Sequence, residues 1–142
     1  DAEYFDETIK QMVEKVRHLK IDVVLGIDSR GFLFGPVIAR ELRVGFVPVR
    51  KANKLLPRET VQQTYTLEYG TDGVKIHTDS VLPGQRALIV DDLIATGGTA
   101  LATAKLVEQL GGKVVAFLFL NEASIFLIEK SKTSSNNFSL FK

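Results

Sequence analysis

The sequence predicts one α/β domain built on a parallel sheet. Apolar runs of strand length occur within residues 21–27, 87–90 and 114–120, and each run is continuous rather than alternating. A continuous run is typical of a strand buried on both faces of a parallel sheet. Segments with helical periodicity separate these runs, as in βα units. Because 142 residues with 45% hydrophobic composition suit a single core, we expect one domain over residues 1–142, with four or five parallel strands flanked by helices.

The first part of the chain predicts two βα-type segments. Within residues 3–19, apolar side chains recur at spacings of three and four, which predicts an amphipathic helix on the sheet. The strand at 21–27 ends in the polar turn Asp28-Ser29-Arg30-Gly31. A helix follows, with apolar residues spaced from 33 to 42, and then a short strand at 45–49. The end of the first strand therefore presents polar groups.

The most basic window of the chain follows the strand at 45–49. It reads RKANKLLPRE, and its charged residues are Arg50, Lys51, Lys54, Arg58 and the single acid Glu59. Such a run is usually a solvated surface. Residues 95–99, Ala-Thr-Gly-Gly-Thr, form a pattern typical of an anion-binding turn, and this pattern favours a binding function for the basic window instead.

The segment at 55–73 has no periodicity apart from one predicted hairpin. We expect residues 64–69 to pair with residues 74–77 across a turn at 70–73, Gly-Thr-Asp-Gly. A long excursion between core elements is typical of a mobile active-site flap.

The central motif is RALIVDDLIATGGT at residues 86–99. A buried strand runs into Asp91 and Asp92, and an open α/β sheet binds ligands at the carboxyl ends of its strands. Residues Ala95, Thr96, Gly97, Gly98 and Thr99 then supply backbone N–H groups at the start of a helix, which is a good phosphate site. Two carboxylates beside a phosphate need a neutral or cationic partner, such as ribose hydroxyls or Mg²⁺. The motif therefore predicts a site for a sugar phosphate.

The C-terminal part completes the predicted sheet. Gly111 and Gly112 end the helix that follows the central motif, and a buried strand runs from 114 to 120. We expect a weak helix at 122–130, a loop at 130–137 and a last edge strand at 138–141.

Several other kinds of site lack their sequence patterns. A strand ending in Asp-Asp resembles a Walker B element, but no G-x-x-x-x-G-K-[ST] occurs anywhere. The chain has no G-x-G-x-x-G, no H-E-x-x-H and no Cys/His cluster for zinc. Ser29 lacks the G-x-S-x-G context of a nucleophilic serine.

Composition sets the remaining expectations. A net charge of +1 argues against a nucleic-acid binder that works through bulk electrostatics. The chain has no cysteine, no apolar run of 18 residues and no signal-peptide pattern at its start. We therefore predict a cytoplasmic protein with no membrane partner.

Four segments together resemble one family. GIDSRGFLFGP at 26–36, RKANKLLP at 50–57, TLEYG at 66–70 and the central motif occur in the order typical of the adenine phosphoribosyltransferases, a branch of the type I phosphoribosyltransferases. The resemblance implies the type I fold with a flap hairpin. It also implies a purine salvage enzyme that transfers the phosphoribosyl group of phosphoribosyl diphosphate (PRPP) to adenine, giving AMP and pyrophosphate. Mg²⁺ carried on PRPP would be the cofactor, and a homodimer the assembly.

The resemblance also implies a role for each candidate residue. Asp28, Ser29 and Arg30 form the pyrophosphate loop, with Arg30 reaching the pyrophosphate and a cis peptide bond before Ser29. Asp91 and Asp92 bind the ribose, and the turn 95–99 binds the 5′-phosphate. By the same resemblance, the basic positions around the departing pyrophosphate are Arg50, Lys51 and Lys54. The flap carries Glu68 and Tyr69, with Glu68 as its proton-transfer residue, and the apolar positions beside the purine are Phe32 and Leu93.

One departure from the family leaves the identity of the base open. The chain begins at what would be the family's first full helix, so we expect an N-terminal segment that helps to cover the purine to be absent. The base could then be another purine. A second alternative is a non-catalytic domain that senses PRPP or AMP; Arg30, Glu68 and Tyr69 favour the enzyme.

Overall fold

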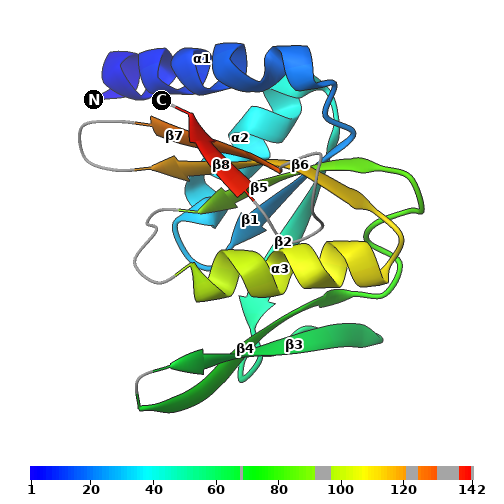
Figure 1. Cartoon of the computed structure of the whole chain (residues 1–142). Helices are drawn as coiled ribbons and strands as arrows, with labels where there is room; N and C mark the ends of the chain where they lie inside the picture. Colours follow the sequence, from blue (N-terminus) through cyan, green and yellow to red (C-terminus); the bar gives the residue numbers. More distant parts are fainter. Residues whose placement is uncertain (68, 92–96, 121–124, 131–137, 142) are drawn as a thin grey trace.

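The structure, a computed structural model, describes residues 1–67, 69–91, 97–120, 125–130 and 138–141. In this part of the chain a mixed sheet of eight strands has the order β3-β4-β2-β1-β5-β6-β7-β8 (Figure 1). The parallel centre consists of β2 (Gly45–Lys51), β1 (Val23–Ile27), β5 (Arg86–Asp91) and β6 (Lys113–Leu120). The predicted parallel sheet of four or five strands is therefore confirmed.

Antiparallel strands extend this centre at both edges. The added strands are β3 (Thr60–Leu67), β4 (Gly70–His77), β7 (Ile125–Lys130) and β8 (Phe138–Phe141). The hairpin of β3 and β4 joins β2, and β7 joins β6. The last edge strand at 138–141 is confirmed as β8.

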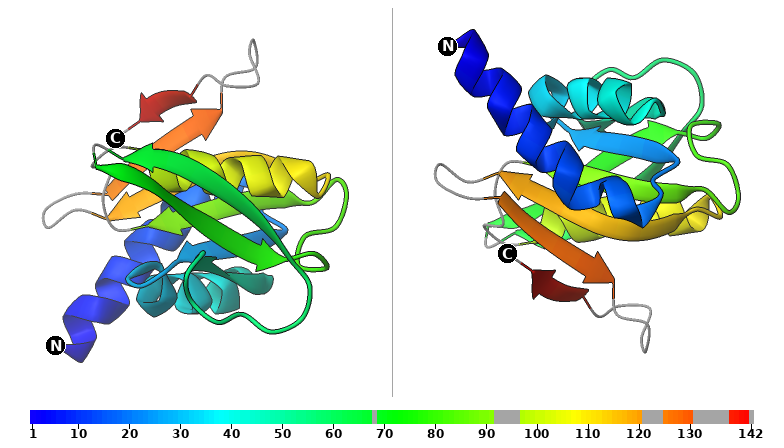
Figure 2. Two further views of the ribbon diagram at one scale, coloured as in Figure 1. Left: turned by 90° about the horizontal axis from the view of Figure 1, so that it is seen from below. Right: turned by 90° about the horizontal axis from the view of Figure 1, so that it is seen from above.

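Helices cover both faces of the parallel centre (Figures 1 and 2). On one face lie α1 (Ala2–Val16), a short 3-10 turn η1 (Arg17–Leu19) and α2 (Gly31–Leu42). On the other face lies α3 (Gly98–Gln109), which also contacts β3 and β4 of the hairpin. The hairpin thus folds across α3, as the view from below in Figure 2 shows.

Alternate residues of one strand fill two separate cores. In β5, Leu88 and Val90 pack in the cluster with α1 and α2, whereas Ala87 and Ile89 pack in the cluster with α3. All four side chains are fully buried. Burial on both faces explains why the sequence of this strand is continuously apolar.

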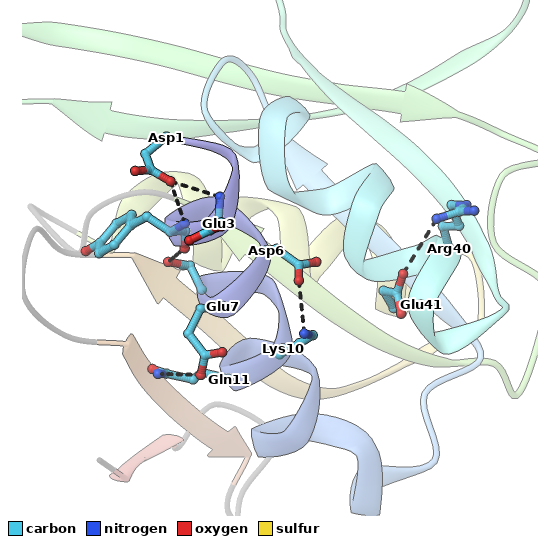
Figure 3. Close-up of polar contacts among 10 residues, drawn as sticks. Asp1, Glu3, Asp6, Glu7, Lys10, Gln11, Arg40 and Glu41 are labelled. Atoms are coloured by element: carbon cyan, nitrogen blue, oxygen red, sulfur yellow. Dashed lines mark hydrogen bonds and ion pairs between the residues drawn. The ribbon is translucent and has the colours of Figure 1, made fainter.

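The first helix begins at a polar cap and presents one apolar side to the sheet. A carboxylate oxygen of Asp1 accepts hydrogen bonds from the backbone N–H groups of Glu3 (2.9 Å) and Tyr4 (3.1 Å), as Figure 3 shows. On the exposed side, Lys10 pairs with Asp6 at 3.0 Å, and this carboxylate raises the pKa of the Lys10 ammonium. The buried side of α1 consists of Ile9, Met12, Val13 and Val16.

Two predicted elements are wrong in kind or position. Residues 122–130 were expected to include a helix, but Ile125–Lys130 forms β7, paired antiparallel with β6. Pairing with the open edge of β6 satisfies backbone groups that a helix there would have left unpaired. The expected turn at 70–73 belongs to β4, because Gly70 pairs with Leu67 and Gly73 pairs with Thr64. Its two glycines resembled a turn but lie within a ladder.

Candidate functional site

The candidate site lies at the carboxyl ends of three neighbouring strands. Asp28 follows β1, Arg50 lies near the end of β2, and Asp91 ends β5. The sheet order β2-β1-β5 brings these ends to one edge, because all three strands run parallel. Asp28 thus lies next to the ends of both neighbouring strands, although Arg50 is 22 positions away from it in the sequence (50 − 28) and Asp91 is 63 positions away (91 − 28).

Glycines bring the start of α2 close to this edge. A Cβ atom on Gly31 would lie only 2.6 Å from the carbonyl oxygen of Val90, and one on Gly35 would lie 2.6 Å from the Phe46 ring. A Cβ on Gly26 would meet the same ring at 2.7 Å. A side chain at Gly26 or Gly31 would clash with backbone atoms and push α2 away from β1 and β5, whereas one at Gly35 would meet the Phe46 ring of β2. The three glycines, Gly26, Gly31 and Gly35, therefore allow α2 and the turn 28–30 to pack closely against the strand ends.

Asp28 fixes the guanidinium of Arg50. Its Oδ2 lies 3.5 Å from Arg50 Nε, and the side chains are 16% and 32% exposed. Neither of these two buried atoms has a hydrogen-bond partner among the described residues. Arg50 Nη1 also donates to the carbonyl oxygen of Leu55 at 3.1 Å. Arg50 is therefore held from two sides at the edge of the site.

The polar turn after β1 has the predicted backbone. The peptide bond between Asp28 and Ser29 is cis, as expected. The backbone N–H of Asp28 donates to the carbonyl oxygen of Val49 at 3.0 Å, which ties the turn to β2. Ser29 and Arg30 are exposed, directly before α2.

The two predicted basic residues after Arg50, Lys51 and Lys54, have surroundings that differ from those of Arg50. Lys51 Nζ donates to the Tyr65 hydroxyl at 3.1 Å and lies 5.7 Å from the centre of that ring. Neighbouring residues of a strand face opposite sides, which separates Lys51 from Arg50. Lys54 is exposed in the turn after β2. Of the three predicted basic residues, the structure brings Arg50 next to Asp28 and Lys51 next to the hairpin.

The structure describes only part of the predicted ribose phosphate site. Asp91 is buried, with 9% of its surface exposed, at the end of β5. Helix α3 begins at Gly98, and Gly97 before it has a φ of 71°, a conformation that glycine adopts readily. Thr99 lies in the first turn of this helix. Asp92, Leu93, Ala95, Thr96 and the hairpin residue Glu68 lie outside the described residues.

Two aromatic residues of the prediction have different surroundings. Phe32, in the first turn of α2, is half-buried and meets Phe46 edge to face, with ring centres 6.4 Å apart. Tyr69, beside the hairpin turn, is 95% exposed. Phe32 is thus fixed next to the strand ends, whereas Tyr69 extends into solvent.

Sequence reasoning missed three residues near the site. Phe46 packs under Gly26 and Gly35, and Tyr65 and Asp72 pair across the hairpin. Tyr65 and Asp72 are equally far from the observed turn between Leu67 and Gly70, which is the signal that could have found them. The prediction put the turn at 70–73, so it did not pair these two residues.

The described residues show neither a metal cluster nor a membrane span. In that part of the chain, no three His, Cys, Asp or Glu side chains gather as a metal site would need. No helix described there is long and apolar enough to cross a bilayer.

Known proteins resemble the chain over most of its length. The family described as phosphoribosyl transferase domain matches residues 3–138. An adenine phosphoribosyltransferase of Alkaliphilus oremlandii is 55% identical over 122 residues, which cover 86% of this chain and 70% of that protein.

Solved structures give the same result. The adenine phosphoribosyltransferase of Thermoanaerobacter pseudethanolicus superposes with a TM-score of 0.80 at 53% identity, covering 84% of this chain and 69% of that one. The Saccharomyces cerevisiae enzyme, solved with an imino-altritol bisphosphate and adenine, has a TM-score of 0.77 at 45% identity and covers 84% of this chain and 69% of that one. The chain therefore belongs to the phosphoribosyltransferase family, and within it to the adenine phosphoribosyltransferases.

Proposed function

We propose that this chain transfers the 5-phosphoribosyl group of PRPP to adenine at the edge formed by β2, β1 and β5. In this reaction the bond from ribose C1′ to the pyrophosphate oxygen breaks, and a bond from C1′ to adenine N9 forms. Pyrophosphate leaves with the electron pair, and the N9 proton passes to a base. The observation that carries the proposal is the Asp28–Arg50 pair beside Asp91, on three adjacent strand ends.

The basic groups at this edge suit the leaving pyrophosphate. Arg50 is held by Asp28 and by the carbonyl oxygen of Leu55, so its charge is in place before the ligand arrives. Arg30 lies in the turn before α2 and supplies a second guanidinium. Positive charge placed in advance stabilises the charge that develops on a leaving group. Ser29 and the N–H groups of the turn complete the proposed pyrophosphate loop.

The carboxylate at the end of β5 suits the ribose. Asp91 is largely buried, where a hydrogen bond to a carboxylate is stronger than in water. It would accept hydrogen bonds from the ribose hydroxyls together with Asp92. Gly97, Gly98 and Thr99 open α3, whose N-terminus favours the 5′-phosphate together with Ala95 and Thr96.

The base is proposed to lie between apolar side chains and the hairpin. Phe32 is fixed by Phe46 and offers one flank, and Leu93 would offer the other. Glu68 would take the N9 proton, and Tyr69 would close over PRPP with the hairpin. Lys51 faces the hairpin and Lys54 is exposed after β2, so these two would add positive charge on the hairpin side of the site.

Mg²⁺ would arrive on PRPP and leave with pyrophosphate. Hard oxygen ligands suit this ion, and Asp91 is a carboxylate of that kind at the proposed site. When bound, Mg²⁺ would neutralise part of the pyrophosphate charge. We further propose a cytoplasmic homodimer without nucleic-acid or membrane partners, in keeping with a net charge of +1.

A panel of bases tests the proposal. Purified protein is incubated with PRPP, Mg²⁺ and either adenine, hypoxanthine, guanine or xanthine, and nucleotide formation is followed by chromatography. We expect AMP from adenine and at least about a hundredfold slower turnover of the 6-oxopurines, because a site built to bond one set of edge groups rejects another. Turnover of a 6-oxopurine at a similar rate would assign another base. Tight PRPP binding without turnover of any base would assign a sensor.

A further inference from the structure

Three side chains form a hydrogen-bonded chain from the end of β2 into the hairpin. Lys51 Nζ donates to the hydroxyl of Tyr65 at 3.1 Å, and this hydroxyl donates to Asp72 Oδ2 at 3.4 Å. The second carboxylate oxygen, Oδ1, accepts from the backbone N–H of Gly73 at 2.7 Å. All three side chains are half-buried. Both oxygens of Asp72 are therefore held, and Tyr65 has a donor and an acceptor.

This chain of bonds supplements a short backbone connection. The hairpin pairs β3 with β4 over eight residue pairs, but β4 pairs with β2 at only two, Arg50 with Lys75 and Lys51 with Val74. One more backbone bond, from Ala52 N–H to the carbonyl oxygen of Gly73 (2.8 Å), extends this seam. The hairpin thus has few polar ties to the strand that carries Arg50.

The tie lies close to the hairpin turn. Tyr65 and Asp72 face each other two pairs before the last pair, Leu67 with Gly70. The other described side-chain ties of the hairpin are at its base, where His77 Nε2 donates to the carbonyl oxygen of Pro57 at 2.6 Å. The buried core side chains of β4, Val74 and Ile76, also lie nearer the base of the hairpin than Asp72 does.

We propose that Tyr65 and Asp72 are positioning residues that fix the hairpin turn relative to the pyrophosphate end of the site, acting through Lys51. The proposal rests on the proposed function, which assigns proton transfer and closure over PRPP to Glu68 and Tyr69, the two residues between β3 and β4 in the sequence. With the hairpin closed over the site, the tie would set the position of the turn relative to Arg50, and with it the relation between the proton-accepting group and the leaving-group charge. Misplacement of reacting groups by about 1 Å costs about a hundredfold in rate.

The chemistry of the three groups supports a single unit. The Lys51 ammonium also lies 5.7 Å from the centre of the Tyr65 ring, where a cation is attracted to the ring face. Its positive charge and the carboxylate of Asp72 flank one hydroxyl. Removing that hydroxyl breaks both bonds while the ring keeps its packing against the core.

Kinetics of Tyr65→Phe, Asp72→Asn and the double variant test the proposal. Tyr4→Phe is the matched control, because Tyr4 is 72% exposed on α1 and loses the same hydroxyl. We expect Tyr65→Phe to lower kcat/KM for PRPP about tenfold with a Tm within about 4 °C of the control. The double variant should lose no more than Tyr65→Phe alone, since one unit is already broken.

Amide hydrogen exchange supplies a readout that does not depend on turnover. In Tyr65→Phe we expect faster exchange in β3 and β4 near the turn, and unchanged exchange in β1 and β5. Equal kinetics and exchange in Tyr65→Phe and Tyr4→Phe would overturn the positioning role while leaving the proposed function intact. Additive losses in the double variant would also overturn it. If the wild type forms no AMP, the proposed function fails, and exchange alone decides on the tie. If Tyr65→Phe does not fold, Asp72→Asn, which keeps the tyrosine, decides by the same measurements.

Discussion

A carboxylate in the proposed pyrophosphate loop needs a physical reason, because it would repel the ligand. At Asp28 the reason is the Arg50 guanidinium, 3.5 Å from Oδ2 in a setting where the aspartate is 16% exposed. Attraction between unit charges is several times stronger there than in bulk water. Holding Arg50 should therefore outweigh the repulsion of the anion.

Asp28→Asn decides between these two effects. We expect the KM for PRPP to rise about tenfold, because Arg50 loses the charge that orients it. Asp79→Asn is the control: Asp79 pairs with Arg58 at 3.0 Å, but both side chains are 66% exposed, and such surface pairs contribute little. A lower KM in Asp28→Asn would show that repulsion dominates.

Asp91 should discriminate between the two substrates. Asp91→Asn is expected to weaken PRPP binding by about 1.5 to 3 kcal/mol, the usual cost of a lost hydrogen bond to a charged group. Adenine brings no ribose hydroxyls, so its affinity should not change. Calorimetry with each ligand measures this, and equal losses for both would argue for general damage to the strand end.

Glu68 is the proposed proton acceptor and should act on kcat. Glu68→Gln is expected to lower kcat by about a hundred- to ten-thousandfold, the usual range for general acid–base assistance. Thr66→Ala, at an exposed position of β3, is the control for hairpin shape. A raised KM with unchanged kcat in Glu68→Gln would remove the proton-transfer role.

At the level of elements, the junction of α2 with the sheet determines the geometry of the site. Gly31 leaves no room for a side chain, since its Cβ would lie 2.6 Å from the Val90 carbonyl oxygen, and backbone cannot move aside easily. Gly45, by contrast, has nothing within 4 Å of such an atom. The two glycines therefore make a matched pair.

Gly31→Ala is expected to destabilise the fold by about 1 to 3 kcal/mol, the usual cost of an inserted methyl group in a packed region. It should also reduce activity more than this loss of stability explains, because α2 and the turn 28–30 must move away from β5. Gly45→Ala should change neither property by much. Urea unfolding of both variants measures the stability difference, and equal values would show that the junction can adapt.

The elements that sequence predicted correctly have patterns of their own. The strand at 87–90 and the helix at 3–19 show their burial in local periodicity, and both formed as expected. The strand at 125–130 depends instead on the free edge of β6, which no local pattern reveals. The pairing of Tyr65 with Asp72 likewise depends on hairpin register, and a misplaced turn changes every partner.

At the scale of the whole molecule, the sheet order makes the site. Sequence alone identified Asp28, Arg50 and Asp91 as polar groups at strand ends, but their placement at one edge of the sheet follows from the order β2-β1-β5. In this fold α3 and the hairpin lie on the opposite face of the parallel centre from α1 and α2 (Figure 1). The proposed site for PRPP then draws on the ends of three neighbouring strands.

The most direct test of this account is the stoichiometry of the wild-type reaction. Protein, PRPP, Mg²⁺ and adenine are mixed, and AMP and pyrophosphate are measured together over time. Transfer at one site predicts equal amounts of both products at every time point and neither product when adenine is left out. Pyrophosphate release without AMP, or PRPP binding with no product at all, would contradict it.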